Sequence, residues 1–487
     1  GARLGWAGPS NTASLHIPAS FKGTHRLRSS WTLTPFHAPR DASRIFGRAM
    51  RRYHSQSWEP PDCQVLAGAG VASLTLHHGG RLNPYINYPF HASTTLKLRA
   101  FSQRCAKLNI DVSIYYTHRE ISVHADELPL ATALYNRTLA TSSRPNLANE
   151  KFAALDHRLN NIPADVVRAW STDMRGGETP HGGPDLALAV TARSAWSNFY
   201  ARGAGYLAQC AFVRGLYLDG IAMPPSVLAR TRRNFRRGGF DLHAANKTSV
   251  YLELYPHFDS VWTGEASDYG ADQAHFLVGI AGAPFGLPSQ MLSGMVRRDP
   301  GLYYRGLLFG MTDRAGWFPD PKGSNIQRLS ALWNLFDLLD LAHSKITGSL
   351  WGSTRSSIDV SCSSPDVAVS VFHRESVGAL VVIASWSPRQ HQCTVSCSSF
   401  ILEPQIPALQ CGSTTVFRER ATFTVEPDSG LVLIVGEREP LLAAMAEAGL
   451  VRTAQGCPHP PVKMPGKRKQ QPPMRRPGGG AAARQRP

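Results

Sequence analysis

The sequence predicts an α/β protein in which a (β/α)8 TIM-like barrel is followed by a C-terminal antiparallel β-sandwich and preceded by a truncated β-rich N-terminal segment. Two patterns lead to this prediction. Between residues 61 and 355, short apolar runs alternate with longer stretches of helical periodicity, as in βα repeats with a parallel sheet. Between residues 356 and 437, short strand-like runs are separated only by turns, which is typical of a sandwich.

Residues 1–60 are polar and low in periodicity, apart from a strand-like run at 26–34 that contains Trp31. We interpret them as the remnant of an N-terminal β-rich module. The barrel is expected to begin at residue 61, where the alternation of apolar runs and helical stretches starts.

Eight apolar runs are the predicted barrel strands, the number that a closed (β/α)8 barrel requires. They lie at 71–76, 110–116, 166–170 or 186–190, 214–218, 239–242, 260–263, 276–280 and 307–311. Three stretches in which apolar residues recur every three or four positions predict helices. These are 94–108, 195–212 and 325–341.

The region 356–437 is the predicted β-sandwich. Its strands are expected at 367–372, 379–385, 414–417, 421–425 and 430–435. Residues 438–487 are expected to form a short helix, at 440–448, and a disordered basic tail. The tail is rich in Pro, Gly, Ala and Gln, a composition that cannot bury a core.

The formal charge of +17 raises the question of nucleic-acid binding. Much of the excess lies in the segment 463–487, which holds no acidic residue, so we do not expect nucleic acid as a partner. A second basic run, at 230–237, is interpreted as a solvated crossover helix. No apolar run reaches about 18 residues, so no membrane span is expected. Oligomeric state is not indicated.

The eight cysteines show no CxxC pair and no zinc-type spacing with histidine. We therefore expect no metal and no cofactor. Four cysteines fall in the strand-rich C-terminal region, where disulfides would require an oxidising compartment. They are Cys362, Cys393, Cys397 and Cys411. A secreted or organellar location fits the sequence, which does not fix the compartment.

Acidic side chains follow three successive predicted strands, where a parallel barrel collects its functional groups. Asp219 ends the run 214–218, and Asp241 and His243 follow in the next strand. Glu265 and Asp268 come after the strand that contains Trp262. Cleavage of a glycosidic bond needs two carboxyl groups on either side of it. Asp219 and Glu265 are the predicted catalytic pair, and Trp262 could stack on a sugar.

The loops after the first two predicted strands are dense in aromatic, amide and imidazole groups. Such a lining suits a polyhydroxylated ligand. Asn87 and Tyr116 are therefore predicted to bind substrate, together with Asp241, His243, Asp268 and Trp262. Loop packing around Pro84 and Pro89 is the structural alternative. The histidines of these loops do not have the spacing of a metal site.

Several runs together resemble proteins related to glycoside hydrolase family 123. They are 83–90, 114–122, 215–222, 241–246, 262–269 and 282–287, within a similarity that covers about residues 30–437. The resemblance implies a catalytic barrel between two β-sandwiches and activity on hexosaminides. In that family the substrate's acetamido oxygen is the nucleophile, an Asp orients the acetamido group and an adjacent Glu is the general acid.

Asp219 matches the Asp of that pair, but Gly220 stands where the Glu would be. This departure leaves three hypotheses open. In the first, the acid comes from elsewhere, with Glu265 as the leading candidate. In the second, Asp219 is a nucleophile with Glu265 or Asp268 as acid and base. In the third, the protein binds carbohydrate without cleaving it, because it has lost the general acid.

Overall fold

The computed structural model divides the chain into two compact units, residues 1–35 and 36–487. It describes residues 3–7, 12–16, 42–134, 138–141, 166–172, 185–191, 195–220, 223–236, 238–244, 254–264, 267–270, 272–281, 287–299, 301–317, 324–349, 358–404, 406, 416–448 and 450. In the first unit, β1 (Arg3–Ala7) and β2 (Thr12–His16) form an antiparallel hairpin. The predicted strand at 26–34 lies outside the described residues.

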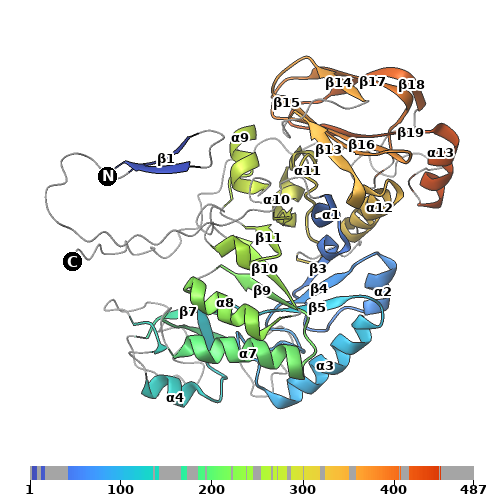
Figure 1. Ribbon diagram of the computed structural model, residues 1–487. Coiled ribbons are helices and arrows are strands. Elements are labelled where there is room, and N and C mark those ends of the chain that lie inside the picture. Colours follow the sequence, from blue (N-terminus) through green and yellow to red (C-terminus); the bar gives the residue numbers. More distant parts are fainter. Residues whose placement is uncertain are drawn as a thin grey trace, which may run out of the picture. The chain divides into compact units, whose positions relative to one another are not determined.

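The second unit is built around a parallel sheet whose strands fan out across its centre (Figure 1). Its strand order is β12-β11-β10-β9-β5-β4-β3, and every neighbouring pair is parallel. The strands are β3 (Arg52–Ser55), β4 (Ser73–Leu76), β5 (Asp111–Tyr115), β9 (Gly215–Asp219), β10 (Gly239–Ala244), β11 (Ser260–Thr263) and β12 (Ser289–Gln290).

One further segment, at 313–315, joins the two edges of this sheet. Ala315 makes a parallel bridge to Tyr53 of β3, and Asp313 makes one to Met291, directly after β12. The segment thus occupies the eighth strand position and closes the ring. The predicted TIM-like barrel is confirmed.

Helices cover the outer side of the barrel, as a parallel sheet requires. They include α2 (Cys63–Gly68), α3 (Ala92–Ala106), α7 (Trp196–Cys210), α8 (Pro225–Asn234), α10 (Ser293–Arg298), α11 (Gly301–Leu307) and α12 (Ser324–Leu338). The predicted helices at 94–108, 195–212 and 325–341 are confirmed as α3, α7 and α12. The basic run at 230–237 begins in α8, the crossover between β9 and β10. Among the described residues, no helix combines the length and apolar character that a membrane crossing requires.

Three of the eight predicted barrel strands are not barrel strands, counting the alternatives 166–170 and 186–190 as one. The runs at 166–170 and 186–190 belong to a separate antiparallel sheet of β6 (Glu120–Ser122), β7 (Arg168–Thr172) and β8 (Asp185–Ala189). The run at 276–280 is a π-helix that follows α9 (Gln273–His275). The run at 307–311 begins with the last residue of α11 and precedes the eighth strand position. A short apolar run alone does not distinguish a buried strand from a buried helical segment.

The barrel begins earlier in the chain than predicted. β3 lies before residue 61 and pairs in parallel with β4. Ahead of it come α1 (Ala42–Ile45) and the short 3-10 helix η2 (Arg48–Met50). The strand was missed because its sequence, Arg-Tyr-His-Ser, is polar. Arg52 and His54 are nevertheless buried, because their side chains contact Asp241 and Trp262 inside the barrel.

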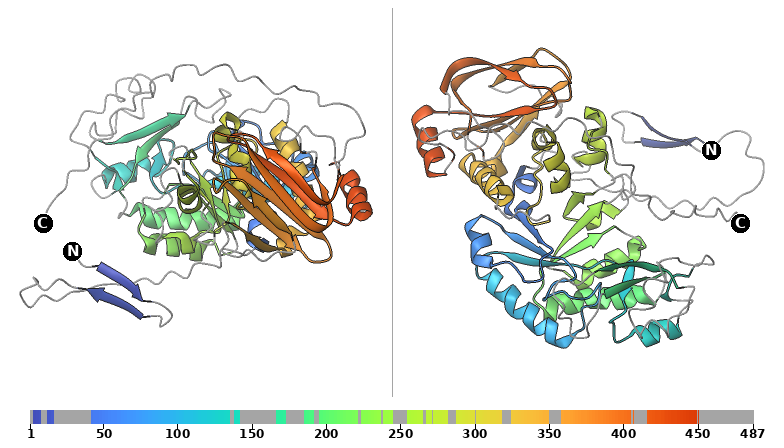
Figure 2. Two further views of the ribbon diagram at one scale, coloured as in Figure 1. Left: turned by 90° about the horizontal axis from the view of Figure 1, so that it is seen from above. Right: turned by 180° about the vertical axis from the view of Figure 1, so that it is seen from behind.

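The C-terminal part is an antiparallel sheet of order β13-β15-β16-β19-β17-β14, with β18 added to β17. Its strands are β13 (Lys345–Gly348), β14 (Asp359–Cys362), β15 (Val367–Arg374), β16 (Gly378–Ser385), β17 (His391–Leu402), β18 (Val416–Val425) and β19 (Gly430–Gly436), followed by α13 (Arg438–Glu447). The bend in β17, with a register shift between Ser396 and Phe400, folds the sheet over itself (Figure 2, orange to red).

Alternating side chains of this sheet bury two separate apolar clusters. In β16, Leu380 and Val382 join the core that includes the barrel helices, whereas Val381 and Ile383 join a cluster inside the sheet. Arg305 of α11 ties the two regions together, because its side chain donates to the carbonyl of Ser385. The predicted C-terminal antiparallel region is therefore confirmed.

Two disulfides lie within the described residues. Cys63 of α2 is joined to Cys105 of α3, and Cys362 of β14 is joined to Cys393 of β17. The second pair comes from the cysteine group that the sequence indicated. Cys397 is a free thiol, and Cys411 lies outside the described residues.

Candidate functional site at the barrel mouth

Asp219 is the last residue of β9, where that strand ends at the mouth of the barrel. It is paired in the parallel register with His243 of β10, and Tyr217 is paired with Tyr115 of β5. Paired residues of neighbouring strands, and residues two apart on one strand, point to the same face of a sheet. These four side chains therefore share the inner face of the barrel.

Three donors surround the Asp219 carboxylate. His243 Nδ1 lies 3.0 Å from Oδ1, while the Tyr115 hydroxyl and Arg119 Nη2 donate to Oδ2 at 3.3 and 3.2 Å. A quarter of the Asp219 side chain (25%) stays exposed, whereas the His243 side chain is buried. The carboxylate is thus held by fixed groups while part of it remains open to a ligand.

These contacts decide the charge of Asp219. Burial by itself raises the pKa of the carboxyl group, but the hydrogen bond and charge of His243 and the charge of Arg119 lower it. The net result is a pKa lowered from 3.8 to about 2. Asp219 is therefore ionised at neutral pH. It can accept a hydrogen bond, attack as a nucleophile or stabilise a positive charge, but it has no proton to donate.

His243 links Asp219 to Tyr217. Its Nδ1 atom lies 2.6 Å from the Tyr217 hydroxyl as well as 3.0 Å from Asp219 Oδ1. Burial, followed by the charge of Asp219, raises the pKa of Tyr217 well above its ordinary value of 10, so the phenol stays neutral. Because the Asp219 carboxylate is ionised and can only accept, His243 Nδ1 is the donor in the hydrogen bond between them. This bond fixes the orientation of both groups.

A second carboxylate lies close to Asp219. Arg119 Nη2 is 3.2 Å from Asp219 Oδ2 and 3.6 Å from Glu120 Oε1. Because both oxygens are measured from one atom, they are at most about 6.8 Å apart, the two distances added. Glu120 is 4% exposed and begins β6, directly after the loop that leaves β5. The sequence run 115–120 therefore brings a cation and a second acid to the mouth.

Asn87 holds that loop in place. Its amide nitrogen donates to the carbonyl of Glu120 at 3.0 Å, and its amide oxygen accepts from the backbone N–H of Thr117 at 2.7 Å. The residue is 1% exposed and has a positive φ of 54°, a conformation that asparagine tolerates better than most residues. Asn87 was predicted to bind substrate; the structure places it behind Arg119 and Glu120 as a support.

Asp241 lies deeper in the barrel, level with Tyr217. Its carboxylate accepts from Arg52 at 2.7 Å, from Arg314 at 2.7 and 3.2 Å, and from Ser260 at 2.6 Å. Burial raises its pKa, but the two arginines more than compensate and lower it to about 2. This buried cluster explains the polar sequence of β3. It also leaves Asp241 engaged with protein groups rather than facing a sugar.

Two predicted aromatic contacts are likewise directed into the protein. Trp262 is fully buried, donates to the carbonyl of Met291 and lies under the Arg314 guanidinium, 4.5 Å from its ring centroid. Tyr116 stacks on Tyr200 of α7, and each hydroxyl donates to the other residue's carbonyl. Trp262 thus packs inside the barrel, against His54 and His243, whereas Tyr116 packs the barrel against α7.

The sequence also predicted two acids after β11. Glu265 lies outside the described residues, and Asp268 is exposed to solvent. Seven of the eight predicted site residues are described. Among them, Asp219 and His243 are hydrogen-bonded, Trp262 packs on His243 with 4.8 Å between ring centroids, and Asn87 supports the loop that carries Arg119. In the part of the chain that the structure describes, no group of three His, Cys, Asp or Glu side chains is arranged to hold a metal ion.

Sequence reasoning missed four groups of this site: Tyr115, Arg119, Glu120 and Tyr217. The signal for Tyr217 was its spacing, because it stands two residues before Asp219 and so shares its face. Tyr115 is the last residue of β5 and is the direct strand partner of Tyr217. Arg119 lies in the loop that follows β5, and Glu120 begins β6. In such a segment, the spacing of residues does not predict the direction in which their side chains point.

The chain has similarities to known proteins. A family model described as glycoside hydrolase 123, TIM-barrel domain, matches residues 47–316, which is more than half of the 487 residues. No match is found among curated proteins.

Solved structures with a similar fold include a maltogenic α-amylase of Thermotoga neapolitana, with 10% identity, a TM-score of 0.49 and coverage of 80% of this chain and 99% of that one. An Anoxybacillus α-amylase has 11% identity and a TM-score of 0.48, with 80% and 98% covered. A debranching enzyme of Nostoc punctiforme has 10% identity and a TM-score of 0.48, with 78% and 90% covered.

Proposed function

The chain belongs to the glycoside hydrolase 123 TIM-barrel family, and from that premise we propose that it hydrolyses a glycosidic bond of a hexosaminide at the barrel mouth. The observation that carries the proposal is the Asp219 carboxylate at the barrel mouth, which is ionised and partly exposed, with a second carboxylate nearby. Asp219 and Glu120 have oxygens at most about 6.8 Å apart. Carboxyl pairs of glycosidases are about 5–5.5 Å apart in retaining and about 6.5–9.5 Å apart in inverting enzymes.

Asp219 has the charge that such a reaction needs. A carboxylate that is ionised at neutral pH and held by His243 and Arg119 stabilises positive charge that develops at the sugar. On a 2-acetamido sugar it accepts the acetamido N–H and orients that group toward the anomeric carbon. We assign this role to Asp219. The substrate's own oxygen then forms the new bond to the anomeric carbon as the leaving group departs.

The leaving oxygen needs a proton from another residue. Glu265, after β11, is the leading candidate for this acid. Glu120, whose carboxylate contacts the same arginine as that of Asp219, is the second candidate. Asp268 and His243 are assigned to sugar hydroxyls, because Asp268 is exposed after the same strand and His243 is hydrogen-bonded to the partly exposed carboxylate of Asp219. Asp241, Trp262, Asn87 and Tyr116 support the site from within.

Hydrolysis of aryl glycosides tests the proposal. N-acetylgalactosaminide, N-acetylglucosaminide and galactoside carrying the same chromophore are compared, and turnover of an acetamido sugar is expected. Asp219→Asn is expected to abolish it. Loss of the general acid slows poor leaving groups far more than activated ones. Glu265→Gln and Glu120→Gln are therefore compared on nitrophenyl and dinitrophenyl leaving groups.

The variant that selectively loses the poor leaving group identifies the acid. Undiminished hydrolysis in Asp219→Asn would contradict the role of Asp219. Equal loss on both leaving groups in both glutamate variants would show that neither supplies the proton.

Binding of carbohydrate without cleavage is the second candidate function, and one observation favours it. Gly220 has a φ of +68°, a conformation that a glutamate at this position would rarely adopt, so the local backbone is built for glycine. Calorimetry with the products of the same panel separates the functions. Binding that depends on Asp219, in a protein that hydrolyses none of the glycosides, would establish this second function.

A further inference from the structure

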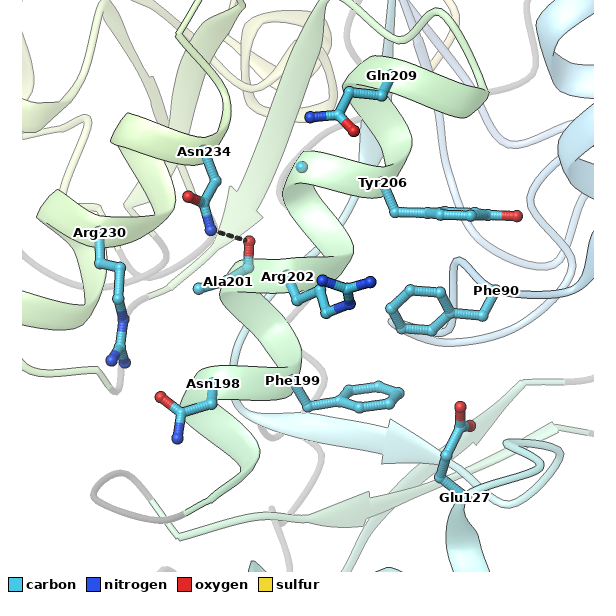
Figure 3. A pocket seen from close by; sticks show the side chains of 11 residues that line it. Phe90, Glu127, Asn198, Phe199, Ala201, Arg202, Tyr206, Gln209, Arg230 and Asn234 are labelled. Atoms are coloured by element: carbon cyan, nitrogen blue, oxygen red, sulfur yellow. Dashed lines mark hydrogen bonds between the residues drawn. The ribbon is translucent and has the colours of Figure 1, made fainter.

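A groove on the outer side of the barrel lies along α7, between the loop that carries Phe90 and helix α8 (Figure 3). Its volume is about 740 Å³, within the range of about 300–1,000 Å³ typical of ligand sites. Small residues of α7, Ala201 and Gly205, line it together with Arg230 and Asn234 of α8. The groove shares no lining residue with the cluster around Asp219.

Aromatic rings form one side of the groove. Phe90 lies 4.9 Å from Phe199 and 5.0 Å from Tyr206, measured between ring centroids. All three rings are partly exposed, and Figure 3 shows them on the same side of α7 as Arg202. Flat apolar faces of this kind pack against sugar rings. Asn198, Gln209 and Asn234 add amide groups that can bond hydroxyls.

The groove also carries the positive charge of two arginines, Arg202 and Arg230. Arg202 and Arg230 have no ion pair among the described residues, whereas Arg232 on α8 pairs with Asp259 at 2.8 Å. The Nε atom of Arg230 is buried without a hydrogen-bond partner in this part of the chain. Neither α7 nor α8 contains an acidic residue. The lining therefore has two guanidinium groups for an anion.

One acid faces the groove. Glu127 lies beside Phe199 in Figure 3, and its buried Oε2 has no hydrogen-bond partner among the described residues. A carboxylate at this position accepts a hydrogen bond from a sugar hydroxyl. The groove thus offers stacking surfaces, an acceptor and two separate cations, the combination that a charged sugar chain requires.

We infer that this groove is a second binding site, for a negatively charged oligosaccharide that bears carboxylate or sulfate groups. The aromatic rings receive the sugar faces, and Arg202 and Arg230 receive the anionic groups. The choice of a carbohydrate rests on the proposed function, but binding here does not require hydrolysis at Asp219.

The test measures binding to the full chain by calorimetry. The probes are a heparin-derived hexasaccharide, an oligogalacturonate hexamer and the neutral maltohexaose. Arg202→Gln and Arg230→Gln are each expected to weaken binding of an anionic probe by about tenfold, because a hydrogen bond to a charged group is lost. Phe199→Leu is expected to weaken it as well.

Arg233→Gln is the matched control, since Arg233 is an exposed arginine of α8 that does not line the groove. It is expected to bind like the parent protein. Hydrolysis of a small aryl glycoside, measured in parallel, is expected to be the same in all four variants. A parent protein that binds the anionic probe but hydrolyses none of the glycosides would therefore count against the proposed function alone.

Three results would overturn the inference. If Arg233→Gln weakened binding of the anionic probe as much as the groove variants, the probe would be attracted to positive charge in general and not to this groove. Equal binding of maltohexaose would remove the role of the arginines. Tighter binding of a single-stranded oligonucleotide of equal charge, lost in Arg202→Gln, would assign the groove to nucleic acid.

Discussion

His243 Nδ1 lies 3.0 Å from Asp219 Oδ1, and this hydrogen bond is the largest single influence that lowers the pKa of Asp219. The register of the sheet produces the contact, because the two residues are direct partners on neighbouring parallel strands. The imidazole is buried and the carboxylate is partly open. The strand pairing therefore fixes both the position and the charge of the carboxylate that faces the ligand.

His243→Phe is expected to shift the acidic limb of the pH–rate profile to higher pH. Phenylalanine keeps the ring but removes the donor, so the pKa of Asp219 rises from about 2 as burial prevails. Ionised Asp219 then exists only at higher pH. The measurement is kcat/KM from pH 3 to 8. Tyr217→Phe retains the imidazole donor and serves as the control. An acidic limb that stays in place in His243→Phe would refute the proposed role of His243.

The protein is expected to lose stability as the pH falls from about 4 to about 2. Asp219 and Asp241 both have pKa values lowered from 3.8 to about 2 in the folded state. A carboxyl group whose pKa is lower in the folded state than in the unfolded state stabilises the fold above the unfolded pKa. This stabilisation is lost as the group takes up a proton at lower pH. Each group contributes on the order of 2 kcal/mol at neutral pH. Urea unfolding at pH 7, 4 and 3 measures this. Asp241→Asn should flatten the dependence; an unchanged slope would contradict it.

Asp241→Asn is also expected to destabilise the fold at neutral pH. It would leave the buried guanidinium groups of Arg52 and Arg314 without their shared anion. Breaking a buried ion cluster from one side costs about 3–5 kcal/mol. Asp268→Asn, at an exposed position, is the control and should change the free energy of unfolding by less than about 0.5 kcal/mol. Similar unfolding midpoints in both variants would show that the cluster adds no net stability.

The same cluster shows how far the sequence could predict this fold. Alternation of apolar runs and helical stretches identified β4, β5, β9, β10 and β11, because their outward faces are buried under helices. β3 escaped, since Arg52 and His54 look solvent-facing in a polar run. They face inward instead, where Arg52 meets Asp241 and His54 packs against Trp262 with 5.1 Å between ring centroids. Contacts between distant strands have no local signature.

The candidate site was predictable to a similar degree. A carboxylate at a strand end, Asp219, is visible in sequence because strand ends are recognisable. Arg119 and Glu120 were not, because they come from a loop whose course depends on the Asn87 side chain. Trp262 was predicted to stack on a sugar, and this stays a prediction. It stands at a strand end, but its inward direction places it in the core under Arg314.

Gly220→Glu places beside Asp219 the acid that the resemblance implies there, yet it is expected to bring no faster hydrolysis. Gly220 has a φ of +68°, and its N–H bonds the carbonyl of His243 at 3.0 Å. A side chain in this left-handed conformation costs about 1–2 kcal/mol. Gly220→Ala measures that strain without the carboxylate, so both variants should lose similar stability in thermal unfolding. Faster hydrolysis by Gly220→Glu alone would instead show that the turn adapts and that the missing glutamate is what limits this site.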